Sequence, residues 1–265
     1  MTIIGQDKLL NKINKLTLDT LPHTIMLCGE SGSGRHSIIN YVAEKFNLNA
    51  INISDKLTYE TIEEITLKVE PNIYIIEALG LTNKNENAIL KFLEEPLKNA
   101  FIFIVTETKW DLIETIRNRC HIWQMATYSS EIINTFINEE SQFSSLLLSI
   151  CKTPGDVITM QGYPINDMIL LADKIFDKIG IANYANVLTL SKQIAFKNEK
   201  DKFDFHLFIR LLMYVAKQRV YKNTSNCIAQ YTCALEFVNR SKIKHIAKQD
   251  LFENFLLKLK KVSVS

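Results

Sequence analysis

Residues 24–46 read TIMLCGESGSGRHSIINYVAEKF. The apolar run Thr24–Cys28 has the length and composition of a short buried strand. The loop Gly29–Gly34 contains three glycines, which permit tight turns. From Arg35 to Phe46 the apolar residues recur at the spacing of an amphipathic helix. This stretch therefore predicts a strand, a glycine loop and a helix in immediate succession.

The glycine loop resembles a phosphate-binding loop, which has the pattern G-x-x-x-x-G-K-[ST]. In that pattern, backbone amides surround the phosphates, the lysine reaches the terminal phosphates, and the hydroxyl binds Mg²⁺. Gly29 and Gly34 fit the spacing, and Gly32 lies between them. The lysine position holds Arg35, whose planar guanidinium does not replicate a compact ammonium. The hydroxyl position holds His36, which is not a ligand for a hard cation in such a site.

Ser37 carries a hydroxyl but lies one residue late, which places it about 100° further around the helix. Three interpretations of the loop stay open: a glycine turn of structural use only, an impaired phosphate loop, and an intact ATPase site. The pattern favours the impaired loop and is least typical of an intact ATPase. ATP and Mg²⁺ are possible cofactors only of a degenerate site, and no firm cofactor is predicted.

Four further apolar runs predict strands at Asn49–Ile53, Ile73–Ile76, Phe101–Val105 and His121–Met125. Helical patterns separate them. This alternation predicts an α/β fold, with a mostly parallel sheet that carries helices on both faces. Ligands of such sheets bind at the carboxyl ends of the strands, so the loops at that edge are the candidate site.

The third predicted strand ends in a single acid, Glu77, followed by Ala78. Nucleotide hydrolases of this architecture usually carry two acids there, one for the Mg²⁺ shell and one to orient the attacking water. A lone acid at a strand end is more often a solvated or capping residue than a catalyst. The site therefore lacks one of the two carboxylates that nucleotide hydrolysis usually uses.

Beyond Tyr128 the pattern becomes helical, for example at 130–138, 144–151, 166–179 and 205–220. The turn Thr153–Asp156 precedes a helix start that Asp156 can cap. A second break at Gly162–Pro164 divides this part. We therefore predict an α/β domain at 1–127, a small helical lid at 128–163 and an all-α domain at 166–265.

The overall composition is typical of a folded protein, with 47% hydrophobic and 23% charged residues. The five cysteines show no paired C-x-x-C spacing, which favours reduced thiols and no metal site. The net charge of +2 includes no long basic block, so any DNA contact is local or shared. The apolar runs are too short to span a bilayer, so we expect a cytoplasmic protein without a membrane partner.

Several motifs resemble those of bacterial clamp-loader gamma and delta-prime subunits. Ala88–Pro96 reads AILKFLEEP and resembles the NALLKTLEEP helix end of that family. Thr106–Thr108 and Asp111–Cys120 are similar to its T-N and LLPTIRSRC stretches. Ile4–Gln6 and Leu21–His23 resemble its GQ and LPHA signatures. Because these segments follow the family's order, the resemblance implies an AAA+ P-loop type sheet, a helical lid and a collar domain that joins subunits.

In this family the arginine of the Ser-Arg-Cys motif reaches into the nucleotide site of the neighbouring subunit. Arg119 occupies that position, with Asn118 in place of the serine. An arginine finger sets delocalised positive charge against the charge that develops on the transferred phosphoryl group. Arg119 is therefore the candidate catalytic residue, acting in trans; the alternative is a surface salt bridge. Arg117 is expected to be structural.

The sequence departs from the family pattern at two of the family's nucleotide contacts and in the absence of a zinc insertion. Glu77-Ala78 matches only the middle of the family's Asp-Glu-Ala-Asp motif, and the chain runs from Phe46 to Asn49 without the cysteine-rich zinc insertion of many relatives. Asp156 lies in the turn where active relatives carry an arginine that senses the γ-phosphate, and it would repel that phosphate. This combination resembles delta-prime, the member that does not hydrolyse ATP but completes a neighbour's site.

The resemblance implies a place in a DNA polymerase III holoenzyme-type complex. The implied partners are gamma/tau-like motor and delta-like subunits, the sliding clamp, and primer-template DNA held by the assembled ring. Candidate contacts to DNA phosphates are Lys84, Lys91 and Lys109. Two other functions stay open: an active motor ATPase of a divergent loader, such as a viral one, in which Arg35 and Glu77 suffice, and a stand-alone AAA+-like adaptor.

Two features of the helical part also have two interpretations. A wide apolar face is either ordinary core or an inter-subunit face; it consists of Phe205, Leu207, Phe208, Leu211, Leu212 and Val215. The lysine cluster Lys258, Lys260 and Lys261 is expected to be a solvated helix edge rather than a DNA contact.

Overall fold

The computed structural model describes residues 3–66, 70–79, 81, 83–94, 100–138, 143–197, 200, 202–224, 226–241 and 246–264. The chain forms two compact units. The α/β unit comprises Met1–Phe136 and Lys152–Asp156, and the helical unit comprises Ile137–Cys151 and Val157–Ser265. The segment expected as a lid thus contributes to both units, and the division at 1–127, 128–163 and 166–265 stays a prediction.

The α/β unit contains a parallel sheet in the order β2-β3-β4-β1-β5. The strands are β1 (Thr24–Cys28), β2 (Asn49–Asn52), β3 (Asn72–Glu77), β4 (Ala100–Thr106) and β5 (His121–Gln124). Each corresponds to a predicted strand, with ends that differ by one residue at most. The prediction of a parallel α/β sheet followed by helices is confirmed.

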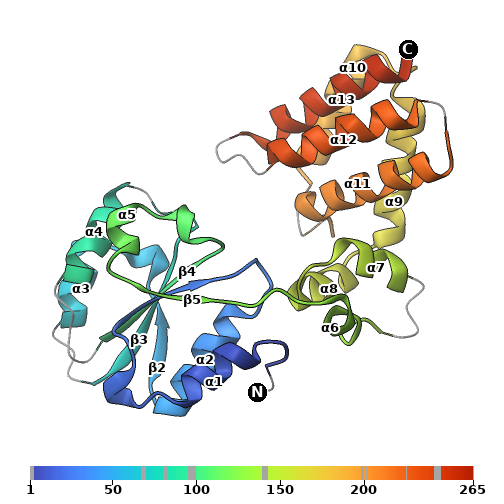
Figure 1. Cartoon of the computed structure of the whole chain (residues 1–265). Helices are drawn as coiled ribbons and strands as arrows, with labels where there is room; N and C mark the ends of the chain where they lie inside the picture. The colour runs from blue at the N-terminus through green and yellow to red at the C-terminus, as the bar shows by residue number, and fades with distance from the viewer. Residues whose placement is uncertain are drawn as a thin grey trace. The chain divides into compact units, whose positions relative to one another are not determined.

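Helices cover both faces of this sheet (Figure 1). On one face lie α1 (Asp7–Asn14) and α2 (Arg35–Phe46), which pack against Ile25 and Leu27 of β1. On the other face lie α3 (Tyr59–Thr66), α4 (Asn83–Glu94) and α5 (Glu114–Arg117), which pack against Met26 and Cys28. Successive side chains of a strand point to opposite faces, so β1 must be apolar throughout. All its residues are buried.

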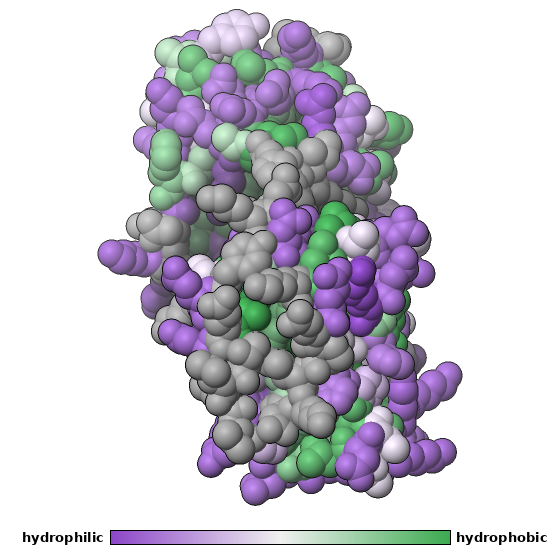
Figure 2. Space-filling view, turned by 90° about the vertical axis from the view of Figure 1, so that its left-hand side faces the viewer, coloured by the Kyte–Doolittle hydropathy of each residue, from purple (hydrophilic) through white to green (hydrophobic). Residues whose placement is uncertain are grey.

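The described residues of this unit also form three short 3₁₀ helices: η1 (Leu18–Thr20), η2 (Ser54–Lys56) and η3 (Lys109–Asp111). Among the residues that Figure 2 colours by hydropathy, on the face seen from the left of Figure 1, most are hydrophilic, and the hydrophobic ones lie in small patches between them. Scattered apolar residues of this kind are normal on a protein surface.

The remaining elements are helical. They are α6 (Ser130–Asn134), α7 (Ser144–Ile150), α8 (Pro154–Gln161), α9 (Ile165–Lys178), α10 (Tyr184–Ala195), α11 (Phe205–Tyr221), α12 (Cys227–Ser241) and α13 (Lys248–Val264). The helix predicted at 130–138 is wrong in length, because α6 ends at Asn134. The apolar period continues through Phe136 and Ile137, but the backbone turns after Asn134.

The apolar face of α11 is core in the structure. Its residues are buried, and Phe205 and Phe208 contact the rings of Phe237 and Phe252 from α12 and α13. The inter-subunit alternative for this face is therefore wrong. No helix among the described residues is long and apolar enough to cross a membrane.

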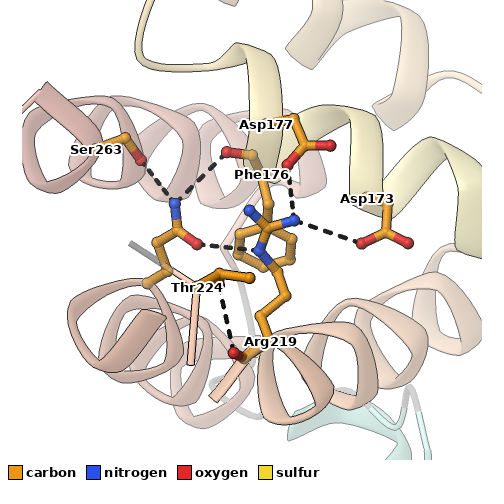
Figure 3. A network of polar contacts seen from close by, with 7 residues as sticks. Asp173, Phe176, Asp177, Arg219, Thr224 and Ser263 are labelled. Carbon is orange, nitrogen blue, oxygen red and sulfur yellow. Dashed lines mark hydrogen bonds and ion pairs between the residues drawn. The ribbon is translucent and has the colours of Figure 1, made fainter. Parts of the chain in front are cut away.

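A polar network around Arg219 ties α11 to α9 and α12 (Figure 3). The guanidinium lies 2.8 Å from Asp177 and 3.6 Å from Asp173, and its Nε donates to Gln230 at 3.3 Å. It also lies over the Phe176 ring, 5.6 Å from the centroid. A mostly buried arginine needs partners of this kind, because an unpaired buried charge is costly.

Of the three terminal lysines, Lys258 and Lys261 are exposed, as expected of a solvated helix edge, but Lys260 is not. Lys260 is half-buried, and its ammonium donates to the carbonyls of Gly180 and Ala182. These carbonyls lie just beyond the end of α9, where a cation is favourable. Lys258 pairs with Glu236 on α12. Lys260 is thus structural.

Candidate functional site

The predicted phosphate loop lies between β1 and α2, at the carboxyl edge of the sheet. Gly34 is the N-cap of α2 with φ +87°, and Gly32 has φ +75°. These left-handed conformations are strained for any residue with a Cβ, which explains both glycines. Gly29 has a different reason: a Cβ there would lie 2.6 Å from Cγ of Met125.

Three hydrogen bonds hold the loop by its carbonyl groups. The Tyr128 hydroxyl donates to Ser33 O at 2.7 Å, and the Thr153 hydroxyl donates to Ser31 O at 3.0 Å. The backbone N–H of Gly155 donates to Gly32 O at 3.0 Å. Burial raises the pKa of the Tyr128 phenol, so this hydroxyl keeps its proton and its role as donor far above neutral pH. The loop is therefore fastened along its length.

Gly32 and Gly155 also touch directly. A Cβ built on Gly155 would lie 2.4 Å from Cα of Gly32, and one built on Gly32 would lie 2.6 Å from Oγ1 of Thr153. Real atoms cannot approach so closely without displacement, so both positions need glycine. The turn at 153–156 thus rests against the backbone of the phosphate loop.

Asp156 is occupied with capping the turn. Its carboxylate accepts from the backbone N–H groups of Lys152 at 2.9 Å and Thr153 at 3.2 Å. The Thr153 hydroxyl accepts from the N–H of Asp156 at 3.2 Å, which completes a capping box. The prediction that Asp156 caps the helix start is confirmed in part: Asp156 caps the N–H of Thr153, whereas the N–H of Asp156 in the first turn is capped by Thr153.

The N-terminus of α2 has no side-chain cap. The N–H groups of Arg35, His36 and Ser37 belong to its first turn, where an α-helix offers them no internal acceptor. Arg35 is half-buried. The Ser33 hydroxyl is buried and makes no hydrogen bond within the described part of the chain. This end of α2 retains a general affinity for negative charge.

His36 and Glu77 meet where a nucleotide site would hold its metal ion. Nε2 of His36 lies 2.8 Å from Oε1 of Glu77, an ion pair when the imidazole is protonated. Oε1 is buried and accepts no hydrogen bond in the described residues, so the two side chains attract each other by charge only when the imidazole is protonated. Mg²⁺ requires oxygen ligands in near-octahedral geometry. His36 offers a nitrogen where a working loop has a hydroxyl oxygen, and Glu77 is the single acid beside it. This pair of side chains does not fit Mg²⁺.

No cluster of three or more His, Cys, Asp or Glu side chains elsewhere in the described residues could hold a metal.

Arg119 lies just beyond the end of α5 with 38% of its side chain exposed. Nη2 is 3.0 Å from Oε1 of Glu94 at the end of α4, and Nη1 donates to Thr115 O at 2.9 Å. The residue is thus on the surface and has the salt bridge of the alternative interpretation. Glu95 and Pro96, which complete the LEEP motif, lie outside the described residues.

Arg117 has a different environment from Arg119. It is half-buried, and its guanidinium lies 4.4 Å from the centroid of the Trp110 ring. Lys109, a candidate for DNA phosphate contacts, is exposed and lies over the same ring at 4.8 Å. The side chains of the other two candidates, Lys84 and Lys91, lie outside the described residues.

Three residues that fasten the loop carry no sequence motif for that role. Tyr128 follows β5 closely, and its only sequence signal is this place at the carboxyl edge of the sheet. The turn that contains Thr153 and Gly155 is visible in the sequence, but its contact with residues some 120 positions earlier is not.

Comparison with known proteins points to one group. Residues 53–129 match the family model described as DNA polymerase III, delta subunit. This segment includes Glu77 and Arg119 but not the phosphate loop. The chain is 32% identical over 69 residues to DNA polymerase III subunit delta' of Haemophilus influenzae, covering 26% of this chain and 21% of that protein. The corresponding Escherichia coli protein is 23% identical over 168 residues, covering 57% of this chain and 48% of that protein.

The matches thus span between about a fifth and a half of these relatives' length. Among solved structures, a DNA polymerase III gamma subunit-related protein of Thermotoga maritima has a TM-score of 0.49 at 16% identity, covering 97% of this chain and 99% of that one. Over residues 53–129 the chain is similar to the family described as DNA polymerase III, delta subunit, and in the pairwise matches it is similar to delta' subunits of bacterial DNA polymerase III.

Proposed function

We propose that this chain is a delta'-like subunit of a clamp loader, which helps to load a sliding clamp onto primed DNA. It does not hydrolyse ATP itself and supplies Arg119 to the nucleotide site of a neighbouring ATPase subunit. The match of residues 53–129 to the DNA polymerase III delta family model, together with the pairwise similarity to delta' subunits, supports the assignment. The segment that matches contains the proposed finger, whereas the altered phosphate loop lies outside it.

The observation that carries the proposal is the contact between His36 and Glu77. In a working site the residue at position 36 would offer an oxygen to Mg²⁺, and the acid at the end of β3 would hold the metal's shell. Here the two side chains are 2.8 Å apart and engage each other. Hydrolysis also needs a carboxylate to orient water, and Glu77 is the only acid at that strand end. Together these features argue against turnover on this chain.

The surroundings of Arg119 suit a residue that acts on a partner. Its bond to Glu94 joins two exposed side chains, and exposed pairs contribute only about 0.2–1 kcal/mol. An arginine finger accelerates phosphoryl transfer by roughly 10³ or more, equivalent to about 4 kcal/mol. The guanidinium can therefore exchange Glu94 for a phosphate at little cost. Before that exchange, the hydrogen bond from Nη1 to Thr115 O restricts the orientation of the Arg119 side chain.

The fastening of the phosphate loop supports a scaffold role. Motor ATPases couple nucleotide state to movement around this loop, whereas here three hydrogen bonds and the Gly32–Gly155 contact hold it in place. The proposed assembly joins this chain to gamma/tau-like motor and delta-like subunits through its helical part, with residues 128–163 as lid and 166–265 as collar. The sliding clamp and primer-template DNA are partners of the assembled ring.

The proposal is tested by ATP hydrolysis in a reconstituted complex in which the neighbouring subunit is the only one with an intact phosphate-loop lysine. Arg119→Ala is expected to lower the rate at that site on the order of 10³-fold. Arg119→Lys should restore little, because an ammonium lacks the planar fork. Arg35→Ala is the matched control and should leave the rate unchanged. The reverse ranking of Arg119→Ala and Arg35→Ala would overturn the assignment in favour of an active motor.

A second measurement separates the motor from the scaffold without a partner. The isolated chain is expected to show no turnover of Mg²⁺-ATP above the blank. Turnover that disappears in Arg35→Ala would show that the chain is itself the ATPase.

A further inference from the structure

Trp110 is an exposed aromatic residue close to Arg119 in the sequence. It lies in η3, directly after β4, with 69% of its surface exposed. The second tryptophan of the chain, Trp123 in β5, is 1% exposed and belongs to the core. Large aromatic residues dominate the energetics of cores and interfaces. Trp110 contributes to neither core of the α/β unit.

The loop that carries Trp110 is held rigidly. The Asp111 carboxylate accepts from the hydroxyl of Thr106 at 2.7 Å and from the N–H of Thr108 at 2.8 Å. The Thr108 hydroxyl in turn accepts from the N–H of Trp110 at 3.3 Å, which closes a capping box around η3. The ring is therefore presented on a fixed backbone, and little conformational entropy remains to be lost on contact.

Two cations fix the ring as well. The Arg117 guanidinium lies 4.4 Å and the Lys109 ammonium 4.8 Å from its centroid, both within the range of a cation–π interaction. Arg117 is the last residue of α5, two positions before Arg119. The same short helix thus links the orientation of the tryptophan to that of the proposed finger.

We propose that Trp110, clamped by Arg117 and Lys109, is the anchor residue of a protein–protein contact with the subunit whose nucleotide Arg119 reaches. The partner surface is an apolar socket with carboxylates at its rim, which complement the two cations. This inference rests on the proposed function, because it assigns the docking surface of that same arginine. Trp110 acts by positioning Arg119 and does not touch the nucleotide.

The charges around Trp110 favour a protein over a nucleic acid. Glu107 and Glu114 are exposed close to it in sequence, and Glu94 pairs with Arg119. A surface that tracks phosphates collects positive charge, whereas this surface mixes both signs. Mixed charge around a central aromatic residue is typical of protein interfaces.

The test uses the single-tryptophan variant Trp123→Phe, so that Trp110 is the only tryptophan this chain contributes to the emission, and the emission of the motor subunit alone is subtracted. Addition of the gamma-type motor subunit is expected to shift this emission to the blue and to protect it from iodide quenching. Trp110→Ala should weaken assembly at least about tenfold, as a hot-spot residue does. Leu18→Ala removes another exposed apolar side chain of the unit and should leave assembly unchanged.

The outcomes separate this inference from the proposed function. Emission that does not change on assembly, with Arg119→Ala still slowing hydrolysis, overturns the anchor and leaves the finger intact. A Trp110→Ala assembly defect without any effect of Arg119→Ala supports the anchor and removes the finger. A blue shift caused by primer-template DNA alone overturns the choice of a protein partner. If Trp123→Phe does not fold, the iodide-accessible fraction of the wild-type emission, measured with and without the motor subunit, gives the same decision.

Discussion

Replacement of Gly32 by alanine is expected to destabilise the α/β unit by an amount that follows from two features of the structure. Residue 32 has φ +75°, and a left-handed backbone costs an L-residue about 1–2 kcal/mol. The new Cβ would lie 2.6 Å from Oγ1 of Thr153 and 3.0 Å from Cα of Gly155. Forced displacement in a well-packed region costs about 1–3 kcal/mol. The expected loss in the free energy of unfolding is therefore about 2–5 kcal/mol.

The assay is urea unfolding followed by tryptophan emission, because both tryptophans of the chain lie in the α/β unit. Gly34→Ala is the matched control. Its φ of +87° imposes the same backbone penalty, but the nearest atoms to a Cβ there are 3.8 Å away. It should lose only about 1–2 kcal/mol. Equal losses for the two variants would refute the reasoning, because the contact with the turn at 153–156 would then contribute nothing.

Three further predictions concern other parts of the chain. Burial raises the pKa of the Cys28 thiol to about 11 and that of Cys120 to about 12, so both should resist iodoacetamide at pH 8 and react once urea unfolds the chain. Because the unfolded thiols ionise near the ordinary value of 9.0, the free energy of unfolding should fall as pH rises from 9 through 11; constant stability over that range would contradict this. Arg219→Met removes the ion pairs to Asp173 and Asp177 and should destabilise the helical unit by about 1.5–3 kcal/mol, measured as helix content against urea, with a smaller loss for Asp177→Asn. Lys45→Met deletes donors to the carbonyls of Ile13, Asn14 and Leu16 at the end of α1 and should cost about 1 kcal/mol, measured by tryptophan emission; an unchanged midpoint would show that water replaces the lysine.

The sheet could be predicted because its strands are locally encoded. Runs such as Thr24–Cys28 are apolar throughout, as strands buried on both faces must be, and glycine loops or helical patterns separate them. The packing of the helical part could be predicted less well from the sequence. The core role of Phe205 and Phe208 depends on rings from α12 and α13, which no local pattern reveals. The helix at 130–138 was predicted too long because the apolar period continues through Phe136 and Ile137, beyond Asn134 where the helix ends.

In the candidate site, too, locally encoded features could be predicted from the sequence, whereas long-range contacts could not. The spacing of Gly29 and Gly34 identifies the loop, and the alternation of strands places Glu77 at the same edge of the sheet. The direct contact of His36 with Glu77 could not be predicted, since it depends on side-chain reach across that edge. Neither could the packing of Gly155 on Gly32, because glycines leave no hydrophobic pattern and the two are far apart in sequence.

A chemical rescue experiment can decide whether the charge at position 119 acts on a neighbour's phosphates. ATP hydrolysis by the neighbouring subunit is measured in the complex that contains Arg119→Ala, with and without added guanidinium ions. If Arg119 provides delocalised positive charge in trans, guanidinium should raise the depressed rate, and the same concentration of ammonium should not. A hydrolysis rate that Arg119→Ala leaves at the wild-type level, or that guanidinium cannot raise, would contradict the arginine finger.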